Sequence, residues 1–251
     1  MQVVVDGLLT SYERSGKGKI IVILPGWGDS ARGWASFAAS LALDYEVIVL
    51  DLPGFGNTQA PTSIWGLADY ALFVAHFLTK TAIKPYAILG HSNGGAITIR
   101  GIASGNLSAT KLVLIASAGI RGEYKGRNQA LRLVTKAGKA LTMPLPGAVK
   151  RKLRHKVYKT IGSDMLVAEH LQETFKRVVT DDVRTDAAKI STPTLLIYGT
   201  NDEATPVRFG EVFQELMKQA KLEVISDAGH FVHLDQPEKV SSLIRGFLQD
   251  V

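Results

Sequence analysis

Residues 86–95 read YAILGHSNGG, a short apolar run followed by a serine that lies between glycines. The run at 86–89 is typical of a strand buried on both faces, and a helical pattern begins near Gly94. A strand that turns sharply into a helix holds a serine hydroxyl above the sheet, and glycines two residues to either side permit the tight turn. We call residues 90–94 the elbow, and this context predicts Ser92 as a nucleophile.

The elbow is one of several units in which a strand precedes a helix. The runs IIVIL, VIVL, LVLIA and TLLIY are short and unalternated, as parallel strands covered on both faces are. Expected strands cover residues 3–5, 8–13, 20–24, 46–50, 86–89, 111–116, 194–198 and 222–226. Expected helices cover residues 33–42, 64–81, 94–104, 206–219 and 237–249. Because strands and helices alternate, the sequence predicts an α/β fold with a mostly parallel sheet.

The alternation stops between residues 119 and 190, where helical patterns are interrupted by the turn MPLPG. We interpret residues 119–190 as a helical cap inserted into a core domain that comprises residues 1–118 and 191–251. A chain of 251 residues with 46% hydrophobic content is long enough for one large buried core.

The net charge of +6 is concentrated in the predicted cap. Twelve basic residues and one acidic residue lie between Arg121 and Lys159, a net +11, so the rest of the chain must carry −5. A solvated helical face is the simplest interpretation, and weak contact with an anionic substrate or membrane surface is the alternative. Only Tyr124 and Tyr158 are interleaved with these charges, so we expect no nucleic-acid partner.

Composition narrows the chemistry further. The chain has no cysteine, which excludes a disulfide, a thiolate metal site and a cysteine nucleophile. The N-terminal sequence has no basic leader followed by an apolar run, and no apolar run approaches the roughly 20 residues that a membrane span needs. We therefore expect a cytoplasmic protein that uses no metal and no cofactor.

A serine hydroxyl needs a base that takes its proton. His230 follows the strand LEVIS on a glycine-containing loop, and catalytic residues of open α/β sheets gather at such strand ends. His91 adjoins the serine, but the turn directs its side chain away, and His233 lies at the start of the next element. The sequence therefore predicts His230 as the base, with His91 and His233 as packing or surface residues.

The base in turn needs a carboxylate that fixes its tautomer. Asp202 follows the strand TLLIY directly. Asp227 is nearer to His230 in sequence, but a separation of three residues in one short loop rarely allows the two side chains to meet. Glu203 would point away from its neighbour. We therefore predict Asp202 as the third member, which gives the chain order Ser92, Asp202, His230.

Backbone N–H groups must also stabilise the negative oxygen that forms during attack on a carbonyl. The first is predicted to be the N–H of Asn93, the residue after the serine. The second is predicted to be the N–H of Trp27, in LPGWGD directly after the strand IIVIL, where flanking glycines let the amide turn inward.

Taken together, these motifs resemble the α/β-hydrolase superfamily over nearly the full length of the chain. The segments that carry the resemblance are LPGWG at 24–28, DLPGFG at 51–56, GHSNGG at 90–95, YGTNDEATP at 198–206 and DAGHFVHLDQPEKV at 227–240. The resemblance implies an eight-stranded sheet, a helical cap between strands six and seven, and a triad of Ser92, Asp202 and His230. It also implies that Asp51 is a structural loop residue.

Within the superfamily, Ser92 excludes the branches that use an aspartate nucleophile, such as epoxide hydrolases. The chain resembles capped esterases and the carbon–carbon bond hydrolases of meta-cleavage products. The latter often carry a longer Gly-Pro-Gly oxyanion loop, which residues 26–29 of this chain lack. They also often have a Trp after the catalytic His, where this chain has Phe231. Many relatives also have a histidine where this chain has Pro25.

We therefore favour hydrolysis of a small to medium carboxylic ester through an acyl-enzyme. The alternatives are carbon–carbon hydrolysis of a vinylogous diketone and a non-catalytic binding protein on the same fold. Phe55, Leu141 and Met143 are expected to line an apolar pocket for this small-molecule substrate beneath the cap.

Overall fold

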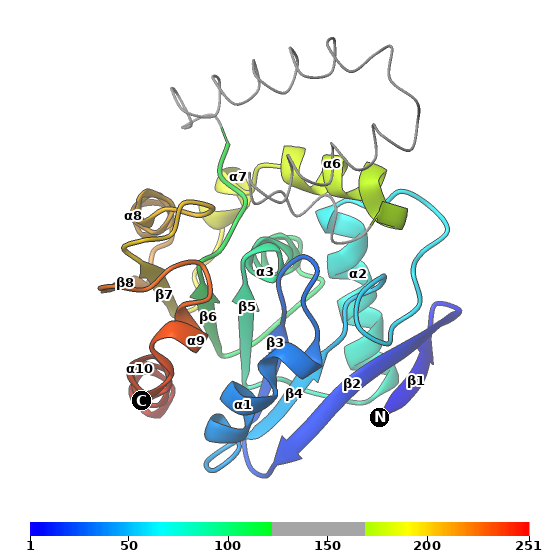
Figure 1. Ribbon diagram of the computed structural model, residues 1–251, viewed down its shortest axis with the longest axis horizontal. Helices are drawn as coiled ribbons and strands as arrows, with labels where there is room; N and C mark the ends of the chain where they lie inside the picture. The colour runs from blue at the N-terminus through cyan, green and yellow to red at the C-terminus, as the bar shows by residue number, and fades with distance from the viewer. Residues whose placement is uncertain (122–168, 251) are drawn as a thin grey trace, which may run out of the picture.

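The computed structural model describes residues 1–121 and 169–250. The described residues form one eight-stranded sheet in the order β1-β2-β4-β3-β5-β6-β7-β8 (Figure 1). The strands are β1 (Gln2–Val5), β2 (Leu8–Gly16), β3 (Ile20–Leu24), β4 (Glu46–Leu50), β5 (Ala87–His91), β6 (Lys111–Ile115), β7 (Thr194–Gly199) and β8 (Ala220–Ile225). β2 pairs antiparallel with β1 and β4, and all other pairs are parallel. The fold class predicted from the sequence is confirmed.

Helices cover both faces of this sheet (Figure 1). The described helices are α1 (Ala31–Leu41), α2 (Leu67–Lys80), α3 (Asn93–Ala103), η2 (Glu169–Leu171), α6 (Gln172–Thr180), α7 (Arg184–Ala187), α8 (Val207–Leu216), α9 (Val232–Asp235) and α10 (Pro237–Gln249). Within β3, Ile21 and Ile23 belong to the core cluster that includes buried residues of α1 and α10, while Val22 and Leu24 belong to the cluster that includes buried residues of α2, α3 and α8. Successive side chains therefore enter two separate cores, which explains why the strand reads as an unbroken apolar run.

Most predicted elements are present, and the largest displacement at the start of a helix is that of α2. The sequence pattern places its start at residue 64, whereas the helix begins at Leu67. Gly66 is the N-cap, and its N–H donates to the carboxylate of Asp69 at 2.7 Å. The N–H of Trp65 donates to Thr174 Oγ1 at 3.2 Å and is thereby held outside the helix.

Residues 116–193 separate β6 from β7, and the structure describes them in part. Their described C-terminal part contains η2, α6 and α7, and α7 contacts α3 and α8 of the core. Val183, Ala187 and Ile190 are buried in the core cluster that also contains these helices. The predicted cap residues Leu141 and Met143 lie outside the described residues.

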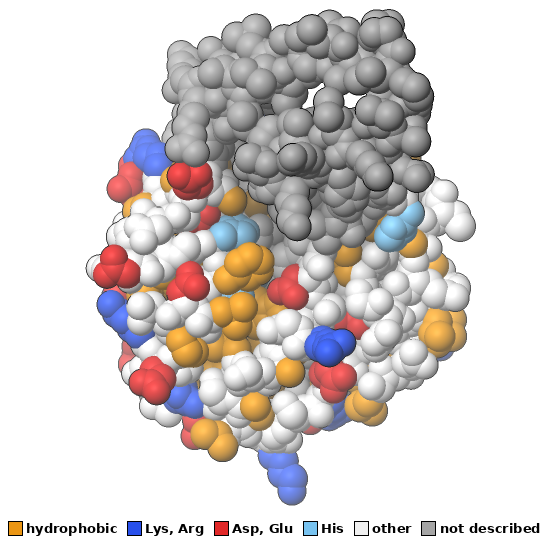
Figure 2. Space-filling view, in the orientation of Figure 1, with side chains coloured by type: hydrophobic (Ala, Val, Ile, Leu, Met, Phe, Trp, Pro, Cys, Tyr) orange, Lys and Arg blue, Asp and Glu red, His pale blue; other side chains and the backbone are white. Residues whose placement is uncertain are grey.

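The surface of the core carries charges of both signs. Figure 2 shows acidic and basic side chains interspersed around a strip of apolar side chains on one face. In the parts of the chain that the structure describes, no helix combines the length and apolar character needed to cross a bilayer.

Candidate active site

The elbow forms the sharp turn that the sequence predicts. Ser92 follows β5 directly, has a φ of 50°, and is the N-cap of α3. A side chain at Gly94 would overlap the carbonyl oxygen of Leu24, and a Cβ at Gly90 would lie 2.6 Å from the carbonyl oxygen of Gly94. Because these are contacts with backbone, only glycine fits both positions. The left-handed backbone of Ser92 is uncommon for a residue with a side chain and is typical of strained functional turns.

His230 and Asp202 meet at the carboxyl end of the sheet. His230 Nδ1 lies 2.8 Å from Asp202 Oδ2, and the carboxylate is fully buried. The Asp202 carboxylate also accepts hydrogen bonds from the N–H groups of Ala204 and Thr205, at 2.8 and 2.9 Å. These contacts fix both oxygens of the carboxylate beneath the imidazole.

The electrostatics of Asp202 follow from this pairing. Burial raises the pKa of the Asp202 carboxyl, but the hydrogen bond and charge of His230 and the hydrogen bonds from Thr205 outweigh it, so the pKa lies below its usual value. Asp202 is therefore ionised at neutral pH and able to stabilise a protonated His230.

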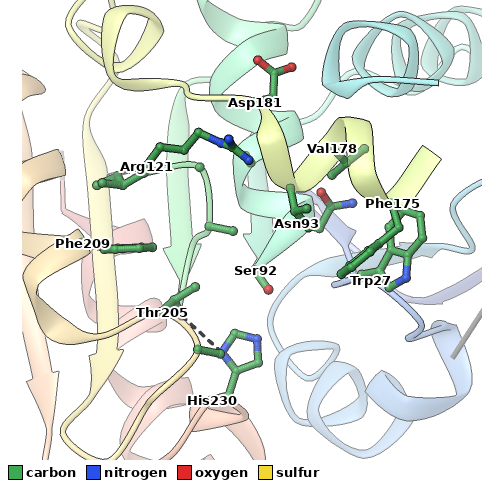
Figure 3. Close-up of a pocket in the computed structure, with 16 residues that line it drawn as sticks. Trp27, Ser92, Asn93, Arg121, Phe175, Val178, Asp181, Thr205, Phe209 and His230 are labelled. Carbon is green, nitrogen blue, oxygen red and sulfur yellow. Dashed lines mark hydrogen bonds between the residues drawn. The ribbon is translucent and has the colours of Figure 1, made fainter. Parts of the chain in front are cut away.

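Thr205 completes this pair, and its role was not predicted from the sequence. Its hydroxyl donates to Asp202 Oδ2 at 2.7 Å and lies 3.2 Å from His230 Nδ1 (Figure 3). Its only sequence signal was a place in the segment YGTNDEATP, two residues before α8.

Ser92 and His230 line one cavity of about 250 Å³. Asn93 and Trp27 line it too, so the structure brings four predicted site residues to one space (Figure 3). Much of the remaining wall is apolar and comprises Ala96, Ala118, Ile120, Phe175, Val178, Val179 and Phe209. Such a mixture of apolar walls and a few polar groups is typical of small-molecule sites.

Trp27 separates Phe55 from the cavity. The Trp27 ring contacts Phe55 edge to face at 4.8 Å and lies 5.1 Å from the ring of Phe175. Phe55 is buried and is not among the residues that line the cavity, whereas Phe175 is. Of the three residues predicted to line the pocket, Phe55 thus lies behind Trp27, and the other two fall outside the described residues.

The loop that carries Trp27 is held by two carboxylates. Asp51 accepts from the N–H groups of Ala31 and Asn57, at 2.7 and 2.9 Å, as expected of a structural loop residue. Asp29 accepts from the N–H of Ser30 and the indole N–H of Trp34. Burial is the largest influence on Asp29 and raises its pKa.

His91 and His233 are both buried, and neither lines the cavity. His91 Nε2 lies 3.0 Å from the carbonyl oxygen of His230. The His233 ring stacks on Trp34 with the ring centroids 3.8 Å apart. Burial and the nearby His230 lower the pKa of His233 to about 3, and burial holds the pKa of His91 well below its usual value. Both are neutral packing residues at physiological pH.

Two charged residues at the cavity were not predicted as site residues. Arg121 and Asp181 line it, and Asp181 accepts a hydrogen bond from Arg100 Nη2 at 2.9 Å. Arg100 also lies 2.8 Å from Asp186, so α3 is tied to the segment that contains α7. No cluster of three or more His, Asp or Glu suited to a metal occurs within residues 1–121 and 169–250.

Comparison with known proteins identifies the class that this fold and site define. The sequence model of the alpha/beta hydrolase family matches residues 21–243, which is most of the chain. The chain therefore belongs to the alpha/beta hydrolase family, and the resemblance seen in its motifs is confirmed. Membership of this family makes the protein a hydrolase.

Individual relatives are distant. The chain is 24% identical to the pimeloyl-[acyl-carrier protein] methyl ester esterase of Aeromonas hydrophila, with 95% of this chain and 98% of the esterase covered. A bacterial membrane phospholipase A has a TM-score of 0.80 at 25% identity, with 99% of this chain and 84% of that one covered. A serine hydrolase involved in carbazole degradation has a TM-score of 0.75 at 25% identity, with 99% and 97% covered.

Proposed function

We propose that this protein hydrolyses small to medium carboxylic esters through an acyl-enzyme formed on Ser92. The observation that carries the proposal is the 2.8 Å contact between His230 and the buried Asp202, in a cavity that Ser92 also lines. An imidazole whose Nδ1 is held by an ionised carboxylate presents Nε2 as the base, which is what activation of a serine requires.

The proposed reaction has two halves. Ser92 Oγ attacks the ester carbonyl carbon while His230 takes the hydroxyl proton, and the same proton then passes to the leaving alcohol as the ester bond breaks. Water attacks the acyl carbon in the second half and gives its proton to His230. Collapse returns that proton to Ser92 and releases the carboxylic acid.

The negative oxygen of each tetrahedral intermediate is assigned to the N–H groups of Asn93 and Trp27. Asn93 is the first residue of α3, so its N–H is among those that the helix leaves unbonded. Loss of one donor of this kind costs about 10² to 10³ in rate in well-studied hydrolases. The mostly apolar wall around these residues supports an acyl group of modest size.

The named relatives bear on the type of bond that is cleaved. The pimeloyl relative is named as a methyl ester esterase, which supports ester cleavage. Solved meta-cleavage product hydrolases share the fold at 21% identity, and we retain carbon–carbon cleavage of vinylogous diketones as the alternative.

A substrate panel distinguishes these reactions. Purified protein is given short-chain nitrophenyl esters, a lactone and a vinylogous diketone, and products are separated by chromatography, with Ser92→Ala as the control. We expect ester turnover that Ser92→Ala abolishes. Carbon–carbon cleavage alone would select the alternative, and equal inertness of both proteins would leave a non-catalytic binding protein.

The basic residues between Arg121 and Lys159 suggest a further property. A relative of similar structure is named a membrane phospholipase A, which supports a test of membrane contact. We propose weak binding to anionic vesicles, which weakens when Lys150, Arg151, Lys152 and Arg154 are made neutral. Unchanged binding by the neutral variant in a sedimentation assay would exclude this role. Location in the cytoplasm stays a prediction.

A further inference from the structure

The carboxamide of Asn93 has no part in the proposed reaction, which uses only the backbone N–H of this residue. Asn93 is only 5% exposed, and its Nδ2 has no hydrogen-bond partner among the described residues. Its side chain lines the cavity and projects from the start of α3 toward Val178 of α6 (Figure 3). A buried amide without a partner is unfavourable, and such a group in a cavity points to a ligand that supplies the missing partner.

The other polar groups at the cavity do not supply a hydrogen-bond partner for Asn93 Nδ2. The indole nitrogen of Trp27 is also buried without a partner, but it is directed away from Ser92 (Figure 3). Arg121 and Asp181 bring one charge of each sign, and Asp181 is paired with Arg100. Arg121 and Asp181 together add no net formal charge to the lining of the cavity.

We propose that the Asn93 carboxamide is a specificity contact for the acyl part of the substrate. The preferred acyl group carries an uncharged oxygen that accepts a hydrogen bond, such as an ether, keto or hydroxyl oxygen, within a few bonds of the ester carbonyl. This inference rests on the proposed function, because Asn93 follows Ser92 directly and the bound ester carbonyl fixes where the acyl chain begins. An unsubstituted alkyl chain would leave Nδ2 without a partner.

The test compares two esters of equal chain length. 4-Nitrophenyl pentanoate and 4-nitrophenyl 3-methoxypropanoate differ by the exchange of one CH₂ group for oxygen. The ratio of their kcat/KM values is measured in the wild type, in Asn93→Leu and in Asn57→Leu, a control at an exposed asparagine. Because each variant is compared with itself, differences in the intrinsic reactivity of the two esters cancel.

We expect Asn93→Leu to lower the preference for the methoxy ester about 3- to 10-fold, the worth of one neutral hydrogen bond, and Asn57→Leu to leave it unchanged. Without ligand, Asn93→Leu is expected to raise the midpoint of thermal unfolding, since it removes an unsatisfied buried donor. A preference unchanged within twofold, or a lower unfolding midpoint, would overturn the proposal.

A binding experiment tests the Asn93 contact separately from the proposed esterase activity. Methyl 3-methoxypropanoate and methyl pentanoate are titrated against Ser92→Ala and against Ser92→Ala with Asn93→Leu, by calorimetry. Tighter binding of the methoxy ester that is lost with Asn93→Leu supports the contact even if the wild type turns over no ester. Equal binding of both esters by Ser92→Ala would overturn it even if the wild type is an active esterase.

Discussion

His91 Nε2 lies 3.0 Å from the carbonyl oxygen of His230, so the residue before the predicted nucleophile is hydrogen-bonded to the backbone of the predicted base. A carbonyl oxygen only accepts hydrogen bonds, and Nε2 must therefore carry the proton. A Cβ at Gly26 would lie 2.9 Å from Nδ1 on the other side of the ring. His91 thus lies between the loop of the base and the loop of Trp27, and its low pKa keeps it neutral.

Replacement of His91 tests whether this contact positions His230. We expect His91→Leu to lower kcat by about 3- to 10-fold, because one hydrogen bond to the His230 backbone is lost, and His91→Gln, which retains a donor, to recover part of the rate. The exposed His76→Leu is the control. A kcat for His91→Leu equal to that of the wild type would mean that the contact only packs the core.

The carboxylate of Asp202 is predicted to be essential for the activity of Ser92, whereas that of Asp227 is not. We expect Asp202→Asn to lower kcat by about 10⁴, since the amide favours the wrong tautomer of His230. Asp227→Asn is the matched control, because Asp227 lies three residues from His230 but is exposed. Ester assays at neutral pH measure both, and a comparable loss in Asp227→Asn would reassign the third member.

His233 is predicted to make the fold acid-sensitive. Its pKa in the folded protein is lowered from 6.5 to about 3, so between these values the unfolded chain binds a proton that the folded protein does not. The contribution of the neutral His233 to the free energy of unfolding is therefore fully present above pH 6.5 and is lost as the pH falls toward 3. At pH 5 the loss from this residue is about 2 kcal/mol.

The variant His233→Phe isolates this contribution, because it retains an aromatic ring against Trp34 but does not titrate. Free energies of unfolding are measured in urea at pH 7 and pH 5. We expect the wild type to lose about 2 kcal/mol more than the variant between the two. Equal losses would show that His233 titrates normally in the folded protein.

Gly94 is predicted to tolerate no side chain. A Cβ there would overlap the carbonyl oxygen of Leu24 and lie 2.6 Å from that of Pro25, and both of these are backbone atoms. We expect Gly94→Ala to lower the free energy of unfolding by about 3 kcal/mol or more, or to prevent folding. Gly246, in α10, has nothing within 4 Å of an added Cβ, and Gly246→Ala should stabilise by about 0.5 to 1 kcal/mol. Thermal unfolding of both variants measures the contrast.

The sequence predicts a structural feature correctly where one short segment determines its local conformation. The run at β3 predicts a strand covered on both faces, and the glycines around Ser92 predict the turn, because each depends on neighbours in the chain. The stack of His233 on Trp34 joins residues almost 200 positions apart, and no local pattern indicates it. The hydroxyl of Thr205 and the placement of Phe55 behind Trp27 likewise depend on how distant segments pack.

Arg100 connects α3 to the segment that contains Asp181 and Asp186. The helix supports the elbow at its first residue, and near its other end Arg100 holds Asp181 and Asp186. The seven residue steps from Asn93 to Arg100 span a helical rise of about 10 Å between these two points. The contacts of Arg100 thereby tie the segment that carries Phe175 and Val178 to the helix that begins beside Ser92, and we expect these two sides of the cavity to move as one body.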